Sequence, residues 1–186
     1  WFPGEFGGQA IAEALFGDYN PGGRLAVTFP KSVGQIPFAF PFKPGSDESS
    51  ETSVYGALYP FGHGLSYTTF QYSDLAISPS KQGVQGNISI SCTIKNIGQR
   101  EGDEVVQLYL RDEVSSVTTY TQVLRGFERI TLKPEASHTV HFELTPQELG
   151  IWDKQMNFTV EPGMFKVMIG SSSKDIRLKG EFEIAQ

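Results

Sequence analysis

The side chains that could perform chemistry in this chain of 186 residues are three histidines, one cysteine and 21 carboxylates. His138 and His141 stand three apart in HTVHFEL, which alternates as a strand does. We therefore expect them on opposite faces and not on one metal ion. His63 lies among glycines and aromatic residues in LYPFGHGLSYTTF (58–70), and we expect a packed histidine there, not a catalyst. Cys92 alternates with isoleucines, which predicts a buried and inert thiol.

The carboxylates give no clear catalytic pair. A glycosidase-like pair needs two acids roughly 5–9 Å apart across a cleft, whereas most acids here fall in turns or on polar strand faces. Asp153 follows Trp152 directly and is expected to form a turn beside a packing aromatic. No zinc pattern, phosphate-binding loop, dinucleotide fingerprint or nucleophile elbow occurs. The sequence therefore predicts no catalytic, cofactor-binding or metal-binding residue, and no cofactor.

Composition excludes several classes of partner. The net charge is −6 and the basic residues are scattered, which disfavours nucleic acid. No apolar run approaches the ~20 residues that a membrane-spanning helix needs, so no membrane partner is expected. A single cysteine allows no disulfide within the chain. The chain opens on Trp1 inside a strong motif, and we expect residues upstream of it in the natural protein.

The N-terminal part has mixed elements. GGQAIAEALFGD (7–18) predicts a helix whose apolar face carries Ala10, Ile11, Ala14 and Leu15. YNPGG (19–23) predicts a turn and RLAVTFP (24–30) a strand that ends at a proline. One such unit cannot bury its own apolar face, so a partner surface, a second copy of the chain or solvent must meet the helix. Residues 31–53 predict an extended crossing with an acidic, solvated loop.

From Thr68 onward the apolar residues recur with period two. Turn sequences separate the segments, and about seven short strands predict an immunoglobulin-like or fibronectin type III-like β-sandwich. The antibody pattern of two cysteines around a tryptophan is absent, which favours the fibronectin subtype. The strands indicated most clearly are 86–96, 103–112, 138–144, 164–170 and 175–184.

Long stretches resemble the C-terminal part of family 3 glycoside hydrolases of the bacterial β-glucosidase and β-xylosidase type. They are WFPGEFGGQAIAEALFGDYNPGGRLAVTFPKSVGQIP (1–37), YPFGHGLSYTTF (59–70), DEVVQLYLRDEVSSVTTYTQVLRGFERITLKP (103–134) and LTPQELGIWDKQMNFTVEPGMFKVMIGSSS (144–173). The resemblance implies a mainly β fold in three parts: 1–40 as the C-terminal remnant of an α/β sandwich domain, 41–66 as a linker and domain junction, and 67–186 as a fibronectin type III-like sandwich. The junction residues it implies are Tyr59, Pro60, Phe61, Gly62, His63, Gly64, Leu65, Ser66 and Tyr67.

The resemblance also implies a role. In that family a retaining mechanism uses an aspartate and a glutamate on domains upstream of this match, so no catalytic residue transfers to this chain. The expected function is a structural domain that braces the catalytic domains of an exo-acting β-glycosidase and is inactive alone. Its partners would be those upstream domains and, through the whole enzyme, a β-linked oligosaccharide or glycoside. A periplasmic or secreted location follows by resemblance only.

An alternative of another class is a free-standing carbohydrate- or surface-binding module. It requires exposed aromatic residues that stack on sugar rings, and Tyr120 and Trp152 are the leading candidates, with Tyr109 and Phe158 beside them. A third expectation concerns the helix at 7–18. Because its apolar face has no evident cover in this sequence, the chain is expected to be prone to self-association there.

Overall fold

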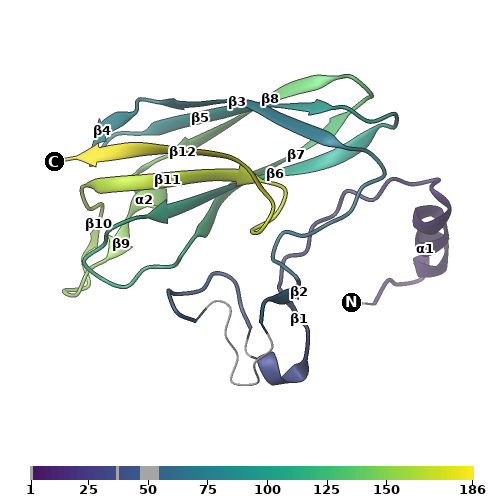
Figure 1. Ribbon diagram of the computed structural model, residues 1–186, viewed down its shortest axis with the longest axis horizontal. Coiled ribbons are helices and arrows are strands. Elements are labelled where there is room, and N and C mark those ends of the chain that lie inside the picture. Colours follow the sequence, from purple (N-terminus) through teal and green to yellow (C-terminus); the bar gives the residue numbers. More distant parts are fainter. Residues whose placement is uncertain (1, 37, 47–54) are drawn as a thin grey trace.

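The computed structural model describes residues 2–36, 38–46 and 55–186, and the chain consists of a β-sandwich with an N-terminal segment beside it (Figure 1). Most of the acidic loop expected before residue 54 lies outside the described residues. The elements, in chain order, are α1 (Gly7–Phe16), β1 (Phe29–Pro30), the 3-10 turn η1 (Val33–Gln35), β2 (Ala57–Tyr59), β3 (Phe70–Ser78), β4 (Lys81–Gly83), β5 (Ile88–Asn96), β6 (Gly102–Asp112), β7 (Val123–Leu132), β8 (Ser137–Leu144), α2 (Pro146–Leu149), β9 (Ile151–Trp152), β10 (Phe158–Thr159), β11 (Gly163–Gly170) and β12 (Ile176–Ala185).

Two sheets form the sandwich. One has the strand order β4-β12-β11-β6-β7 and the other the order β3-β5-β8. All pairs within them are antiparallel except that of β4 with β12. The predicted fold class, a mainly β sandwich after a short mixed segment, is confirmed, and so are the five strands that the alternation indicated.

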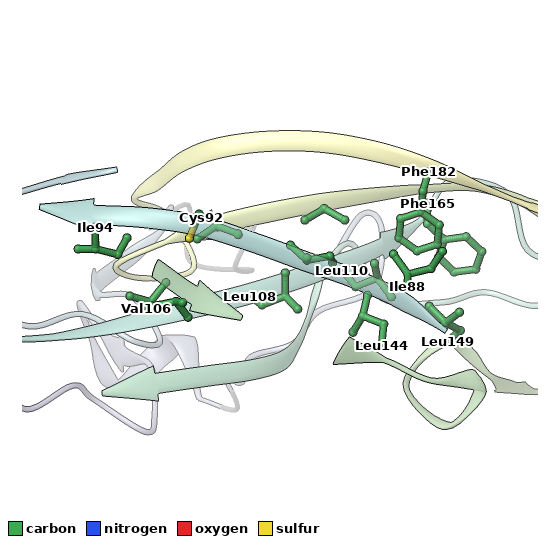
Figure 2. Packing of buried hydrophobic residues seen from close by; sticks show 14 of the residues in the cluster. Ile88, Cys92, Ile94, Val106, Leu108, Leu110, Leu144, Leu149, Phe165 and Phe182 are labelled. Atoms are coloured by element: carbon green, nitrogen blue, oxygen red, sulfur yellow. The ribbon is translucent and has the colours of Figure 1, made fainter. Parts of the chain in front are cut away.

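The core lies between the two sheets, as Figure 2 shows with inward side chains of both layers meeting. β5 supplies Ile88, Ile90, Cys92 and Ile94, all with no exposed surface, at the two-residue period of a strand. Phe165 of β11 and Phe182 of β12 stack in parallel at a centroid distance of 5.4 Å. The core residues from the other elements include Val106, Leu108, Leu110, Val140, Leu144, Leu149, Val167, Ile169 and Ile184.

Helix α1 begins at the predicted residue and ends at Phe16, two residues before the end of the range predicted for it. Gly17 follows it with φ of +83°, the left-handed conformation in which a glycine C-cap is favoured. Ile11 and Leu15 remain exposed, and in Figure 1 the helix stands apart from the sandwich. The contacts that hold it are few: the Tyr67 hydroxyl donates to the Ala14 carbonyl at 2.7 Å, and the Arg100 guanidinium donates to the Gly17 carbonyl at 3.1 Å.

The strand predicted over 24–30 is wrong in extent. Only Phe29–Pro30 forms a strand, and it pairs with β2 alone in a two-stranded ribbon. A strand requires a neighbour along its length to satisfy its backbone groups. Leu25 instead exchanges two backbone hydrogen bonds with the loop at Gly62 and His63. Residues 21–28 are therefore an irregular segment fixed to that loop.

Candidate domain junction and the surface of the sandwich

The loop Phe61–His63 is the place where the N-terminal segment meets the sandwich. Toward the N-terminal side, the Gly62 amide donates to the Leu25 carbonyl at 2.8 Å and the Leu25 amide donates to the His63 carbonyl at 2.9 Å. Toward the sandwich, the Ser173 amide donates to the Phe61 carbonyl at 3.0 Å. The backbone groups of these three consecutive residues thus hydrogen-bond both the N-terminal segment and the sandwich. None of these hydrogen bonds uses a side chain of the three residues.

A buried polar network supports this loop from β6. The Gln107 side-chain amide donates to the Gly62 carbonyl at 3.2 Å and to the Ser171 carbonyl at 2.7 Å, while the Tyr109 hydroxyl donates to Gln107 Oε1 at 2.5 Å. Gln107 is 2% exposed and Tyr109 has no exposed surface. Burial raises the pKa of Tyr109 far above its ordinary value, so this phenol stays a hydrogen-bond donor.

Gly62 is required at its position for two reasons. Its φ of +80° lies in the left-handed region that side chains disfavour. A Cβ there would overlap Gln107 Oε1 and lie 3.0 Å from the Tyr109 hydroxyl oxygen. The glycine therefore lets the loop backbone approach the buried network directly.

A second connection is a buried ion pair. Arg24 Nη2 and Glu104 Oε1 are 2.6 Å apart, and their side chains are only 10% and 4% exposed. Glu104 Oε1 also accepts from the Val105 amide at 3.1 Å. Since a buried charge is costly without its partner, this pair ties the irregular segment after α1 to β6.

The aromatic residues of the junction pack against each other and against Tyr109 of the sandwich. Phe61 stacks on Phe40 at 4.5 Å between ring centroids, and Phe40 meets the edge of Tyr109 at 5.7 Å. His63 stacks on Tyr59 at 5.1 Å with an interplanar angle of 18°. The ring of His63 is thus occupied by packing, and its backbone amide closes a turn onto the Pro60 carbonyl.

The remaining junction residues lie at the edge of this contact. The Ser66 hydroxyl and the Tyr67 amide both donate to Asn20 Oδ1, at 3.2 and 2.8 Å. Gly64 lies against Arg24, where a Cβ would overlap the arginine side chain. Leu65 is exposed. Arg100 lies 5.8 Å from the centroid of the Tyr67 ring.

The two candidate sugar-stacking residues line one pocket at an end of the sandwich. This pocket has a volume of about 250 Å³ and includes Tyr120 and Trp152. Both are exposed, and Phe158 supports Trp152 through an edge contact at 5.5 Å. Tyr109, the third candidate, is wholly buried in the junction network and cannot meet a sugar.

The other residues considered for chemistry lie apart. Asp153 Oδ1 accepts the amides of Gln155 and Asn157, both at 2.8 Å, and these hydrogen bonds hold its pKa below its usual range. Cys92 is buried in the core, and burial raises its pKa to about 11. Among residues 2–36, 38–46 and 55–186, no three histidine, cysteine, aspartate or glutamate side chains gather as metal ligands would. In the same ranges, no helix is long and apolar enough to cross a membrane.

Sequence reasoning missed Gln107, Glu104 and Arg24. A partial signal was present in DEVVQLYLRD, where Gln107 and Tyr109 occupy positions opposite the core face, whereas Glu104 alternates in phase with the core residue Val106. The positions of Gln107 and Tyr109 would be solvated if β6 were covered on one side only. They are buried because the junction loop covers the second side.

Comparison with known proteins finds matches to glycoside hydrolase domains along this chain. Residues 1–67 match the Glycosyl hydrolase family 3 C-terminal domain, and residues 104–173 match the Fibronectin type III-like domain. A periplasmic beta-glucosidase of Salmonella typhimurium is 44% identical over 99% of this chain and 25% of that protein. A beta-xylosidase of Formosa agariphila is 43% identical over 96% of this chain and 25% of that protein.

Solved structures agree. A β-glucosidase from Erythrobacter marinus superimposes with a TM-score of 0.92 at 39% identity, over 100% of this chain and 24% of that one. A beta-glucosidase from Listeria innocua in complex with glucose gives a TM-score of 0.92 at 31% identity, over 100% of this chain and 27% of that one. The chain therefore spans about a quarter of the length of these relatives.

Proposed function

Since this chain is a C-terminal segment of a family 3 glycoside hydrolase, we propose that it braces the catalytic domains of an exo-acting, retaining β-glycosidase. The observation that carries the proposal is the junction loop Phe61–His63, which hydrogen-bonds the N-terminal segment on one side and the sandwich on the other. A loop held by backbone groups on both sides, with a buried glutamine and a buried ion pair beside it, fixes the two parts in one orientation.

The proposed division follows that geometry. Residues 1–40 belong to an α/β sandwich domain, residues 41–66 form the junction, and residues 67–186 form the fibronectin type III-like domain. The exposed Ile11 and Leu15 of α1 support the first boundary, because an amphipathic helix of ten residues is marginal unless a surface covers its apolar face.

The activity of the whole protein is inferred from the activities of the relatives that this chain matches. The relatives named above are β-glucosidases and a β-xylosidase, so the substrate class is a β-linked glucoside or xyloside. The catalytic carboxylates are placed upstream of this match by the family resemblance, and the 186 residues are expected to be inactive alone. The periplasmic relative supports a periplasmic or secreted location.

Side-by-side hydrolysis assays test this proposal. The samples are this chain and the polypeptide encoded by the complete gene, with nitrophenyl β-glucoside and nitrophenyl β-xyloside as substrates. The proposal predicts that the complete polypeptide cleaves at least one substrate and that the chain cleaves neither. Hydrolysis of either substrate by the pure chain of 186 residues would overturn the proposal.

A further inference from the structure

We propose that the pocket between Tyr120 and Trp152 is a carbohydrate-binding subsite that takes one pyranose ring of a neutral oligosaccharide. This proposal goes beyond the bracing role and is independent of it. The pocket lies where the loop after β6 meets α2 and β9, and it has a volume of about 250 Å³.

The walls of the pocket match the two kinds of surface that a pyranose presents. A sugar ring has an apolar C–H face, and aromatic side chains offer rigid apolar area for such a face at a low entropic cost. Trp152 is 59% exposed and Tyr120 is 43% exposed, so both rings can be reached from solvent. The contact of Trp152 with Phe158 at 5.5 Å holds the indole in place before any ligand arrives.

The floor of the pocket is apolar and rigid. Leu149, Leu110 and Phe165 line it, with exposed fractions of 3%, 5% and 1%. These side chains belong to the core of the sandwich, so the floor of the pocket is preformed on a packed layer, while the Tyr120 wall is supplied by the loop between β6 and β7. A preformed apolar cavity with a few polar groups is the usual form of a small-molecule site.

Two polar groups at the rim have unused hydrogen-bonding capacity. Asp112 Oδ1 accepts the Val114 amide at 3.2 Å, while within the described residues no donor reaches Oδ2. Arg125 makes no hydrogen bond or ion pair to any described residue, although Glu148 lies near enough to influence it electrostatically. A carboxylate acceptor and a guanidinium donor can together bind adjacent sugar hydroxyls.

Glu148 itself is already committed. Its Oε2 accepts the Thr145 amide at 2.8 Å and the Thr145 hydroxyl at 2.5 Å in a capping box at the start of α2. Arg125 is therefore not neutralised by a direct contact and remains available to a ligand. Two carboxylates, Asp112 and Glu148, line the pocket with one guanidinium, Arg125, so the net negative charge of this lining favours a neutral sugar over a uronate.

Affinity electrophoresis tests the proposal with soluble β-glucan or xylan cast in a native gel. Migration of this chain is expected to be retarded by at least one polysaccharide, and Trp152→Ala and Tyr120→Ala are each expected to weaken binding about tenfold. Trp152→Phe should restore part of the retardation. The matched control is Phe127→Ala, which removes an aromatic side chain that is 67% exposed and lies outside the pocket. Equal melting temperatures of the variants show that each is folded.

The same gels are run with the polypeptide encoded by the complete gene. Retardation that Trp152→Ala reduces in both the chain and the complete polypeptide supports a subsite. Three results overturn it: unretarded migration of the wild-type chain in every polysaccharide, retardation unchanged by both pocket variants, or a pocket that binds in the chain but is covered in the complete polypeptide.

Discussion

Replacement of Gly62 by alanine perturbs the junction with almost no change in chemistry. The residue combines φ of +80° with direct contact to a buried glutamine. A side chain in the left-handed region costs about 1–2 kcal/mol. The added methyl group also displaces Gln107, which donates to the carbonyls of Gly62 and Ser171. Leaving buried polar groups unpaired costs about 1–3 kcal/mol more.

The expected loss for Gly62→Ala is therefore about 2–5 kcal/mol in the free energy of unfolding. The assay is urea denaturation followed by far-ultraviolet circular dichroism, with intrinsic fluorescence of the chain as a second probe of unfolding. The matched control is Gly45→Ala. Gly45 has the same φ of +80°, but a Cβ there meets no atom of the described residues within 4 Å.

The control separates backbone strain from collision with the buried network. Both variants share the strain and the reduced entropy of the unfolded chain, so their difference reports the displaced glutamine. We expect Gly62→Ala to be less stable than Gly45→Ala by at least about 1 kcal/mol. Equal stabilities of the two variants would refute the assignment of Gln107 as the support of the loop.

Three further perturbations test the same structure. Arg24→Met leaves Glu104 buried without its partner and should lower the free energy of unfolding in urea by about 3–5 kcal/mol. Changing both residues to methionine should recover much of that loss. If Arg24→Met is as stable as the wild type, the ion pair does not hold the segment. Burial raises the pKa of Cys92 from 9.0 to about 11, so the folded chain keeps a proton that the unfolded chain releases between those values. Stability should therefore fall by about 2–3 kcal/mol as the pH rises through that window; Cys92→Ala should lack this component of the alkaline slope, and an identical pH profile for both proteins would contradict the prediction. Tyr67→Phe removes the hydroxyl that donates to the Ala14 carbonyl at 2.7 Å, and amide exchange in α1 should become severalfold faster while exchange in β5 stays unchanged; unaltered exchange in α1 would mean that this bond does not hold the helix.

The sandwich could be predicted because its core strands alternate regularly. In β5 every second residue from Ile88 to Ile94 is buried, and that period is visible in the sequence. β3 was harder to define because its pairing with β5 shifts between Ser73 and Ala76, where Asp74 has φ of +53°. In β7 the register with β6 shifts between Leu124 and Gly126, and Phe127 is exposed, so its pattern also departs from strict alternation.

The junction network could not be predicted, because it depends on partners far apart in the sequence. Gln107 binds Gly62, which is 45 positions away, and Glu104 binds Arg24, which is 80 positions away. Local patterning marks Gln107 as outward-facing and gives no sign that a loop covers it, and it places Glu104 on the core face without showing which charge it meets. The aromatic residues around His63 stack on neighbours from the N-terminal segment and the loop, and Phe40 also meets Tyr109 of β6, a contact between positions too far apart for local patterning to predict.

Thermal inactivation of two polypeptides tests the bracing role most directly. One is encoded by the complete gene, and the other ends at residue 67 and so omits the sandwich. The bracing account predicts that the shorter form loses glycosidase activity at a clearly lower temperature, or is inactive from the outset. Equal activity and equal inactivation temperatures for the two forms would contradict it.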